Sequence, residues 1–246
     1  MITSPTNPKI KYVRALARRR TRQREGQFVI EGVRLIEEAM RAGIIPALMN
    51  FTTDLEGTAR GRTLLTAAEK HGVAPLLVSN ALMKTMSDTQ TPQGVLAVVP
   101  FPQLALPPHP SLALIVDGIR DPGNLGTLLR TAQAAGVDAV FLAPGTVDPY
   151  NPKVVRGAMG AHFRLPIAVR DWDTIATFIS QRQVLLADAQ GELVYDEVDW
   201  CLPSALIIGS EATGASSRAR QLAEGRVSIP MQGETESLNA AIAAAV

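Results

Sequence analysis

Three loops that follow predicted strands carry the polar and small residues that suit a ligand-binding site. They span residues 117–126, 209–214 and 230–239. The last loop leads through Ser237-Leu-Asn239 into a run of alanines, so a helix begins there with free backbone N–H groups and little side-chain bulk around them. Ligands of open parallel sheets bind at the carboxyl ends of the strands. The three loops therefore predict one binding site at that edge of a sheet.

Several common kinds of site are not indicated. None of the three loops has the Gly-x-Gly-x-x-Gly spacing of a dinucleotide fold or the lysine and hydroxyl residue of a Walker loop. The single cysteine, Cys201, excludes an internal disulfide. The three histidines, His71, His109 and His162, are scattered without the spacing of metal ligands. We therefore expect no metal site.

The first part of the chain concentrates positive charge. Residues 1–24 hold eight Lys and Arg residues and no acid, while the whole chain has a net charge of only +1. Ile10, Val13 and Leu16 recur at helical spacing, and a second face carries Lys11, Arg14, Arg18 and Arg22. This pattern predicts a helix that packs by one face and binds a nucleic-acid phosphate backbone by the other. A solvated surface helix or a frayed terminus explains the charge equally well.

The pattern of strands and helices predicts two α/β domains. In residues 1–99, strands at 27–31, 45–51, 74–78 and 94–99 alternate with helices at 33–41, 63–71 and 79–86, which favours a mostly parallel sheet with helices on its faces. Residues 100–110 contain five prolines and predict a stiff linker. In residues 111–246, strands are predicted at 112–116, 139–142, 184–187, 205–208 and 227–229, with helices at 125–135, 152–159, 172–181 and 216–224.

The chain has no feature of a membrane or secreted protein. No apolar run approaches the roughly 20 residues that span a bilayer. The opening Met-Ile-Thr-Ser-Pro lacks the charged and apolar regions of a signal peptide. We therefore expect a cytoplasmic protein with no membrane contact.

The residues of the three loops, taken in order, resemble the motifs of a known family. The segments are Asp117-Gly-Ile-Arg-Asp-Pro-Gly-Asn-Leu-Gly-Thr-Leu-Leu-Arg-Thr-Ala, Ile-Ile-Gly-Ser-Glu-Ala-Thr-Gly and Ile-Pro-Met followed by Ser-Leu-Asn-Ala-Ala-Ile-Ala. They are similar to the three motifs of the SpoU (TrmH-type) RNA ribose methyltransferases of the SPOUT class. The runs Thr3-Ser-Pro-Thr-Asn-Pro-Lys, Phe28-Val-Ile-Glu-Gly and Ser87-Asp-Thr-Gln-Thr-Pro-Gln-Gly resemble the substrate-binding domain that often precedes this catalytic domain. The resemblance covers nearly the whole chain.

This resemblance implies a fold, a cofactor and an assembly. It implies a small N-terminal α/β domain of the ribosomal-protein L30e type and a C-terminal SPOUT domain with a parallel sheet and a trefoil knot, a rare exception to unknotted topology. It also implies bound S-adenosylmethionine and a homodimer. Carried over by position, the cofactor-binding residues are Gly209, Ile229 and Leu238. The residues of the catalytic pocket are Asn124, Arg130, Glu211, Ser237 and Asn239.

The implied chemistry is methyl transfer to a ribose 2'-hydroxyl. The cofactor carries the electrophilic methyl group, so the protein must align the hydroxyl and help to remove its proton. We expect Arg130 to be essential, either by contacting a neighbouring phosphate or, if transiently neutral, by accepting the proton; the strong basicity of a free arginine side chain favours the phosphate contact. Each residue alone has a simpler explanation. Asn124 and Ser237 would serve as helix N-caps, and Arg130 would be a solvated side chain.

Ribosomal RNA is the expected substrate, because the N-terminal sequence resembles the ribosomal type of accessory domain. A transfer RNA methyltransferase is one alternative. A member of the fold that binds RNA without turnover is another. A nicotinamide-dependent dehydrogenase is a third, weakened by the missing glycine fingerprint.

Overall fold

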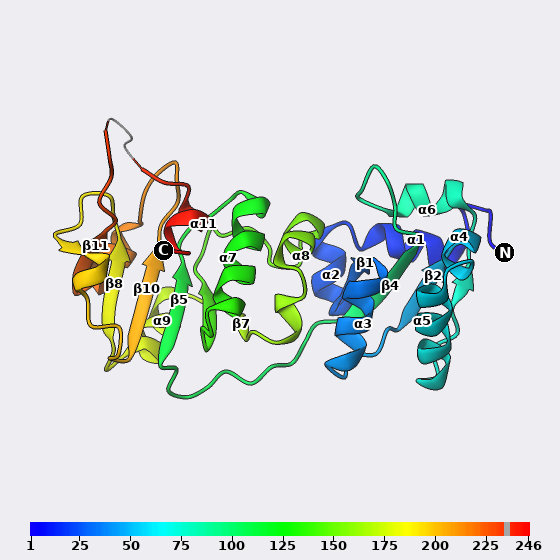
Figure 1. Cartoon of the computed structure of the whole chain (residues 1–246), viewed down its shortest axis with the longest axis horizontal. Helices are drawn as coiled ribbons and strands as arrows, with labels where there is room; N and C mark the ends of the chain where they lie inside the picture. Colours follow the sequence, from blue (N-terminus) through cyan, green and yellow to red (C-terminus); the bar gives the residue numbers. More distant parts are fainter. Residues whose placement is uncertain (234–236) are drawn as a thin grey trace. The chain divides into compact units, whose positions relative to one another are not determined.

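The computed structural model describes residues 1–233 and 237–246, which form two compact units (Figure 1). Unit 1 consists of Met1–Gln103 and Tyr150–Phe163. Unit 2 consists of Leu104–Pro149 and Arg164–Val246. The short segment Tyr150–Phe163 therefore belongs by its contacts to the core built by the first part of the chain. Within the described residues, no helix has the length and apolar character needed to cross a membrane.

Unit 1 contains a mixed four-stranded sheet in the order β1-β4-β2-β3. The strands are β1 (Gln27–Glu31), β2 (Leu48–Phe51), β3 (Leu76–Leu77) and β4 (Val95–Pro100). β4 is antiparallel to both β1 and β2, and only β2 and β3 pair in parallel. The predicted mostly parallel sheet is therefore wrong for this unit. The first three strands do run the same way, as the alternation with helices predicts, but β4, which also follows a helix, inserts between β1 and β2 in the opposite direction.

Helices cover this sheet and complete its core. They are α1 (Pro8–Ala15), α2 (Arg19–Glu25), α3 (Val33–Arg41), α4 (Thr53–Glu56), α5 (Ala59–Lys70), α6 (Asn80–Met86) and α8 (Pro152–Ala158). Phe28 of β1 is fully buried, and its ring centroid lies 4.9 Å from that of Tyr150 and 6.4 Å from that of Phe163. Tyr150 also stacks on Phe101 at 3.8 Å. These ring contacts and the packing of α8 on β1 attach the segment Tyr150–Phe163 to unit 1.

The basic segment forms two short helices instead of one. Ile10, Val13 and Leu16 are buried, which confirms the predicted packing face. Arg22, however, is only 2% exposed, and its Nη1 donates to the carbonyl oxygens of Leu16 (2.8 Å) and Ala17 (2.7 Å). The prediction that Arg22 faces a polyanion is therefore wrong. Its guanidinium instead satisfies carbonyl groups that the end of α1 leaves without helical partners.

Unit 2 contains a seven-stranded sheet in the order β7-β6-β5-β10-β8-β11-β9, and every pair is parallel. This arrangement confirms the predicted parallel sheet. The two strands that the pattern did not predict, β7 and β9, are short strands at the sheet edges. The strands are β5 (Leu112–Val116), β6 (Ala139–Leu142), β7 (Ile167–Val169), β8 (Gln183–Ala187), β9 (Leu193–Val194), β10 (Ser204–Ile208) and β11 (Gly225–Ser228).

The carboxyl ends of the central strands lie side by side. Val116 at the end of β5 is in register with Ile208 at the end of β10, which in turn pairs with Ala187 at the end of β8. The helices of this unit are α7 (Pro122–Ala134), α9 (Trp172–Ile179), α10 (Ser217–Leu222) and α11 (Ala240–Ala243). α11 contacts α7 near this edge (Figure 1). The loops after β5, β10 and β11 therefore meet at one edge of the sheet, as parallel strands require.

Candidate active site

The first two loops are joined by a buried carboxylate. Asp117 directly follows β5 and is 4% exposed. Its Oδ2 accepts a hydrogen bond of 2.6 Å from the backbone N–H of Ser216, and its own N–H donates to the carbonyl oxygen of Ile208 (2.9 Å). Ser216 is in turn the N-cap of α10. A buried carboxylate that accepts a backbone N–H is satisfied in place, so Asp117 fixes the loop after β10 against the loop after β5.

The loop after β10 is itself closed. Ser210 and Gly214 exchange two backbone hydrogen bonds of 3.1 and 2.8 Å. A Cβ atom on Gly209 would lie 2.7 Å from the backbone nitrogen of Ala215, closer than a real Cβ contact. The tight return of the chain therefore requires glycine at position 209. It leaves backbone, with no side chain, at the position predicted to contact a cofactor.

Glu211 at the tip of this loop connects all three predicted motifs. Its Oε1 accepts hydrogen bonds from Nδ2 of Asn124 and from Nδ2 of Asn239 (3.1 Å), as well as from the backbone N–H of Ala240 (3.4 Å). Asn239 Nδ2 also donates to Asn124 Oδ1 at 3.0 Å. The structure thus brings together three of the five predicted catalytic residues, one from each loop. A carboxylate that accepts from two amides and a helix N-terminus is a strong anchor for all three segments.

The simple capping roles considered for Asn124 and Ser237 are wrong. Asp121 caps α7 and accepts the backbone N–H of Asn124 at 2.9 Å, which places Asn124 inside the first turn. Asn239 caps α11, since its Oδ1 accepts the N–H groups of Ala241 (3.0 Å) and Ile242 (3.3 Å). Positions 234–236 of the third loop lie outside the described residues.

A pocket of about 520 Å³ opens beside the Glu211 network. All three predicted cofactor-binding residues line it, and three predicted catalytic residues join them: Gly209, Ile229, Leu238, Glu211, Ser237 and Asn239. Ile208, Met231 and Ala240 add apolar surface. The volume falls in the range of roughly 300–1,000 Å³ that is usual for small-molecule sites.

Sequence reasoning assigned no role to Asp188, Arg220 or Asp117. Asp188 lines the pocket wall, and its Oδ2 lies 3.3 Å from Nη1 of Arg220, which lines the same wall. Asp188 directly follows β8, so the rule that strand carboxyl ends carry binding residues was enough to identify it. The pairing with Arg220 depends on a contact 32 positions apart, which no local pattern indicates.

Arg130 stands apart from this network. It is exposed on α7, roughly 9 Å further along the helix axis than Asn124 at about 1.5 Å per residue. Within residues 1–233 and 237–246 it makes no hydrogen bond or ion pair, and it does not line the pocket. Its guanidinium is therefore available to a molecule outside these residues.

Comparison with known proteins decides the family. Residues 111–246 match the SpoU rRNA Methylase family, and residues 7–97 match the MRM3-like substrate binding domain. The chain belongs to the SpoU methylases. The predicted resemblance is thereby confirmed for both parts of the chain, and it favours methyl transfer over the dehydrogenase alternative.

Relatives of this SpoU methylase match it along nearly its whole length. The 23S rRNA (guanosine(2553)-2'-O)-methyltransferase RlmP of Bacillus subtilis is 32% identical over 100% of this chain and 96% of its own. A crystal structure of an RNA 2'-O ribose methyltransferase superposes with a TM-score of 0.84 at 34% identity and covers 99% of this chain and 95% of its own. The SpoU methyltransferase AviRb from Streptomyces viridochromogenes, in complex with AdoMet, has a TM-score of 0.88 at 28% identity, with 97% and 94% covered.

Proposed function

We propose that this SpoU methylase is an S-adenosylmethionine-dependent RNA 2'-O-ribose methyltransferase that acts on ribosomal RNA. The observation that carries the proposal is the meeting of the three family motifs at Glu211, beside a pocket that contains every predicted cofactor-binding residue. The relative RlmP is a methyltransferase of 23S rRNA, which supports ribosomal RNA as the substrate. The AdoMet complex of AviRb supports the cofactor.

The pocket residues fit S-adenosylmethionine. Ile229, Met231 and Leu238 offer apolar surface for a flat base, while Glu211 and Asp188 place negative charge near a ligand that carries a sulfonium and an ammonium. Arg220 in the same wall offers a partner for a carboxylate. When bound, this cofactor supplies an electrophilic methyl group.

Glu211, Asn124 and Asn239 hold the site together. Both polar atoms of the Asn239 side chain are used inside the protein, Oδ1 by the N-terminus of α11 and Nδ2 by Asn124 and Glu211. Asn239 is therefore a positioning residue, which sets Leu238 and Ser237 at the pocket. Rigid positioning of this kind contributes to rate because the reacting groups then meet in one orientation.

Arg130 acts on the RNA side of the site in this proposal. Its exposed guanidinium, which has no partner among residues 1–233 and 237–246, binds the phosphate next to the target ribose and aligns the 2'-hydroxyl. The fixed charge and the several N–H donors of a guanidinium suit this phosphate contact.

The remaining parts of the proposal rest on the family resemblance and on the composition of the chain. They are a domain division at 1–99, 100–110 and 111–246, an L30e-like N-terminal domain, a trefoil knot in the C-terminal domain, a homodimer, a cytoplasmic location, and RNA binding through the basic segment at residues 1–24. The exposed cations of α1 and α2 support the last of these, with Arg22 now removed from the set.

Methyl transfer from radiolabelled S-adenosylmethionine to separate pools of ribosomal and transfer RNA tests the proposal. We expect label in ribosomal RNA, at a bond resistant to alkali because the 2'-hydroxyl is blocked. Label in transfer RNA alone would show that the protein is a transfer RNA methyltransferase. Cofactor and RNA binding with no label in either pool would establish an RNA-binding member without turnover.

A further inference from the structure

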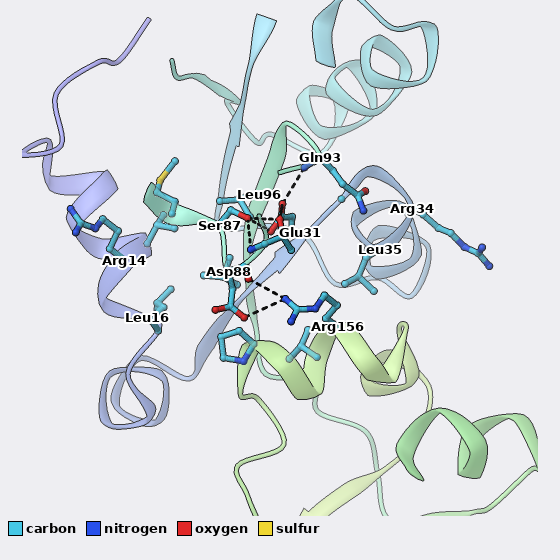
Figure 2. A pocket seen from close by; sticks show the side chains of 18 of the residues that line it. Arg14, Leu16, Glu31, Arg34, Leu35, Ser87, Asp88, Gln93, Leu96 and Arg156 are labelled. Carbon is cyan, nitrogen blue, oxygen red and sulfur yellow. Dashed lines mark hydrogen bonds and ion pairs between the residues drawn. The ribbon is translucent and has the colours of Figure 1, made fainter. Parts of the chain in front are cut away.

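Unit 1 contains a second pocket, of about 560 Å³, that the proposed methyl transfer does not use (Figure 2). Its walls come from α1, from β1 and β4, from α3, from the end of α6 with the loop 87–93, and from α8. The floor is apolar, formed by Val13, Leu16, Val29, Leu35, Met86 and Leu96. Polar and charged side chains stand around it, and Figure 2 shows Arg14, Glu31, Arg34, Gln93 and Arg156 among them.

Glu31 holds the loop 87–93 as one wall of this pocket. Its Oε2 accepts from Ser87 Oγ (2.7 Å), and its Oε1 accepts from Thr89 Oγ1 (3.1 Å) and from the backbone N–H of Gln93 (3.1 Å). Three hydrogen bonds to one carboxylate at the end of β1 fix both ends of the loop. This loop is the motif at 87–94 that resembles the substrate-binding domain, so the structure gives the motif a role in shaping the pocket.

The helix α8 closes the opposite side. Arg156 Nη1 lies 3.2 Å from Asp88 Oδ2, which joins α8 to the same loop (Figure 2). Met159, which ends α8 in a left-handed conformation with φ of 49°, also lines the pocket and is 48% exposed. A methionine at this position offers a flexible, polarizable surface to a bound ring.

Gln93 presents an unused amide at this pocket. Gly32, with φ of 100°, lies beneath it, and a Cβ at position 32 would come within 2.4 Å of Gln93 Oε1. The absence of a side chain at Gly32 therefore leaves the room in which the Gln93 amide lies. In the part of the chain that the structure describes, neither the oxygen nor the nitrogen of this amide has a hydrogen-bond partner. A free donor and acceptor side by side match the edge of a nucleobase.

Positive charge reaches the pocket from the basic segment. Arg14 lines the pocket from α1 and has no ion pair within the described residues, whereas Arg34 and Arg156 are paired with Glu38 and Asp88. The segment 1–24 that contains Arg14 holds no acid. A phosphate backbone that follows α1 would therefore pass the mouth of the pocket.

We infer that this pocket holds one unstacked nucleotide of the RNA substrate, with its base on the apolar floor, its edge on the Gln93 amide and its phosphate on Arg14. The inference rests on the proposed function, since it requires an RNA substrate. The volume suits a single nucleotide, and single-stranded RNA is recognised by splayed bases whose edges are read in this way.

Fluorescence anisotropy of the full-length protein with short rA, rU and rC homopolymers tests the reading of the base. Gln93→Ala keeps the backbone bond to Glu31, and Gln23→Ala, at an exposed position of α2 outside the pocket, is the matched control. We expect Gln93→Ala to weaken the preferred homopolymer about tenfold and to reduce discrimination among the three, with an unchanged salt slope because no charge is lost. Wild-type affinities and discrimination in Gln93→Ala would overturn the inference.

Two further measurements locate the nucleotide. Photo-crosslinking of a 4-thiouridine homopolymer should label peptides from the pocket wall, and labels confined to peptides outside it would also overturn the inference. Arg14→Ala should lower both the salt slope, by about 0.7, and the crosslinking yield, whereas Arg20→Ala, which loses the same charge outside the pocket, should leave the yield unchanged. Equal crosslinking yields in Arg14→Ala and Arg20→Ala would contradict the proposed contact between Arg14 and the phosphate of the bound nucleotide.

Failure of this inference can be distinguished from failure of the proposed function. Label transfer from S-adenosylmethionine to ribosomal RNA in the wild-type protein measures the function, whatever the pocket does. Methyl transfer without a crosslink in the pocket refutes only the inference that the pocket binds a nucleotide. A crosslink in the pocket without methyl transfer refutes only the proposed methyltransferase function.

Discussion

Asn239 donates a hydrogen bond of 3.0 Å to Asn124, 115 positions earlier in the chain. The bond connects the N-cap of α11 to the first turn of α7, and Glu211 accepts from both amides. The pocket proposed to bind the cofactor therefore lies beside a contact between the first and third family motifs. A change at either asparagine is expected to act on cofactor binding through the placement of the loops.

Asn239→Asp separates the two functions of this side chain. An aspartate keeps the oxygen that caps α11, but it replaces the amide donor by a carboxylate next to Glu211. We expect S-adenosylmethionine affinity to fall by about tenfold, which corresponds to about 1.4 kcal/mol, because a hydrogen-bond donor is lost and a like charge is gained. Isothermal titration measures it. The double variant Asn239→Asp, Glu211→Gln should recover much of the affinity, and no recovery would show that the network does not transmit the effect.

Arg130→Ala should abolish methyl transfer while S-adenosylmethionine affinity stays near that of the wild type. The reason is that Arg130 lies outside the pocket proposed for the cofactor and outside the Glu211 network. Label transfer and titration on one preparation check both parts. Arg218→Ala, an exposed arginine of the same unit that pairs with Asp173, is the control for loss of charge. Substantial activity in Arg130→Ala would remove this residue from the site.

Asn50→Leu should stabilise the protein. Asn50 in β2 is fully buried, and neither polar atom of its side chain has a hydrogen-bond partner among residues 1–233 and 237–246. Burial of an unsatisfied amide costs about 1–3 kcal/mol, and an apolar side chain of similar size avoids that cost. The urea midpoint of unfolding should rise, whereas Asn50→Asp should lower it. A lower midpoint in Asn50→Leu would show that the amide has a favourable partner, such as an internal water.

Glu37 should make stability depend on acid pH. Hydrogen bonds from Arg60, at 3.0 and 2.7 Å, lower the pKa of the Glu37 carboxyl below its ordinary value of 4.5. A lowered pKa in the folded state stabilises the protein above the unfolded pKa, and that stabilisation is lost as pH falls through the folded pKa. The free energy of unfolding of the wild type should therefore exceed that of Glu37→Gln at neutral pH, and the difference should shrink below pH 4.5. Urea titrations across this range measure it, with Glu69→Gln as the control for a lost exposed carboxylate. A difference that is constant with pH would contradict the prediction.

The sequence predicts unit 2 better than unit 1 for a physical reason. Buried strands that alternate with helices usually run in parallel, and in unit 2 all of them do, so the directions of β5, β6, β8, β10 and β11 could be predicted from local pattern. The reversed direction of β4 depends on where a late strand inserts, which no local rule sets. Arg22 was misplaced for a similar reason, because its burial depends on a break in the helix at residues 16–18.

The site shows the same division between local and long-range information. The order of motifs was enough to predict Gly209, Ile229 and Leu238 around one pocket. The partners that fix their positions, such as Asp117 with Ser216, lie 99 positions apart and became visible only in the fold. The sequence of α8 likewise does not indicate which unit the helix packs against. Its apolar side chains, such as Val154 and Val155, could be buried in either core.

The attachment of Tyr150–Phe163 to unit 1 has a consequence for synthesis on the ribosome. The first 103 residues leave the ribosome without Tyr150 and Phe163, two of the aromatic partners of Phe28, and these follow only when translation has passed Phe163. At about 5–20 residues per second, an incomplete unit 1 persists for several seconds with Phe28 and its neighbours accessible to solvent. During this interval the nascent chain is a candidate for chaperone binding, because unit 1 can complete its core only after residues 104–149 of unit 2 have been made.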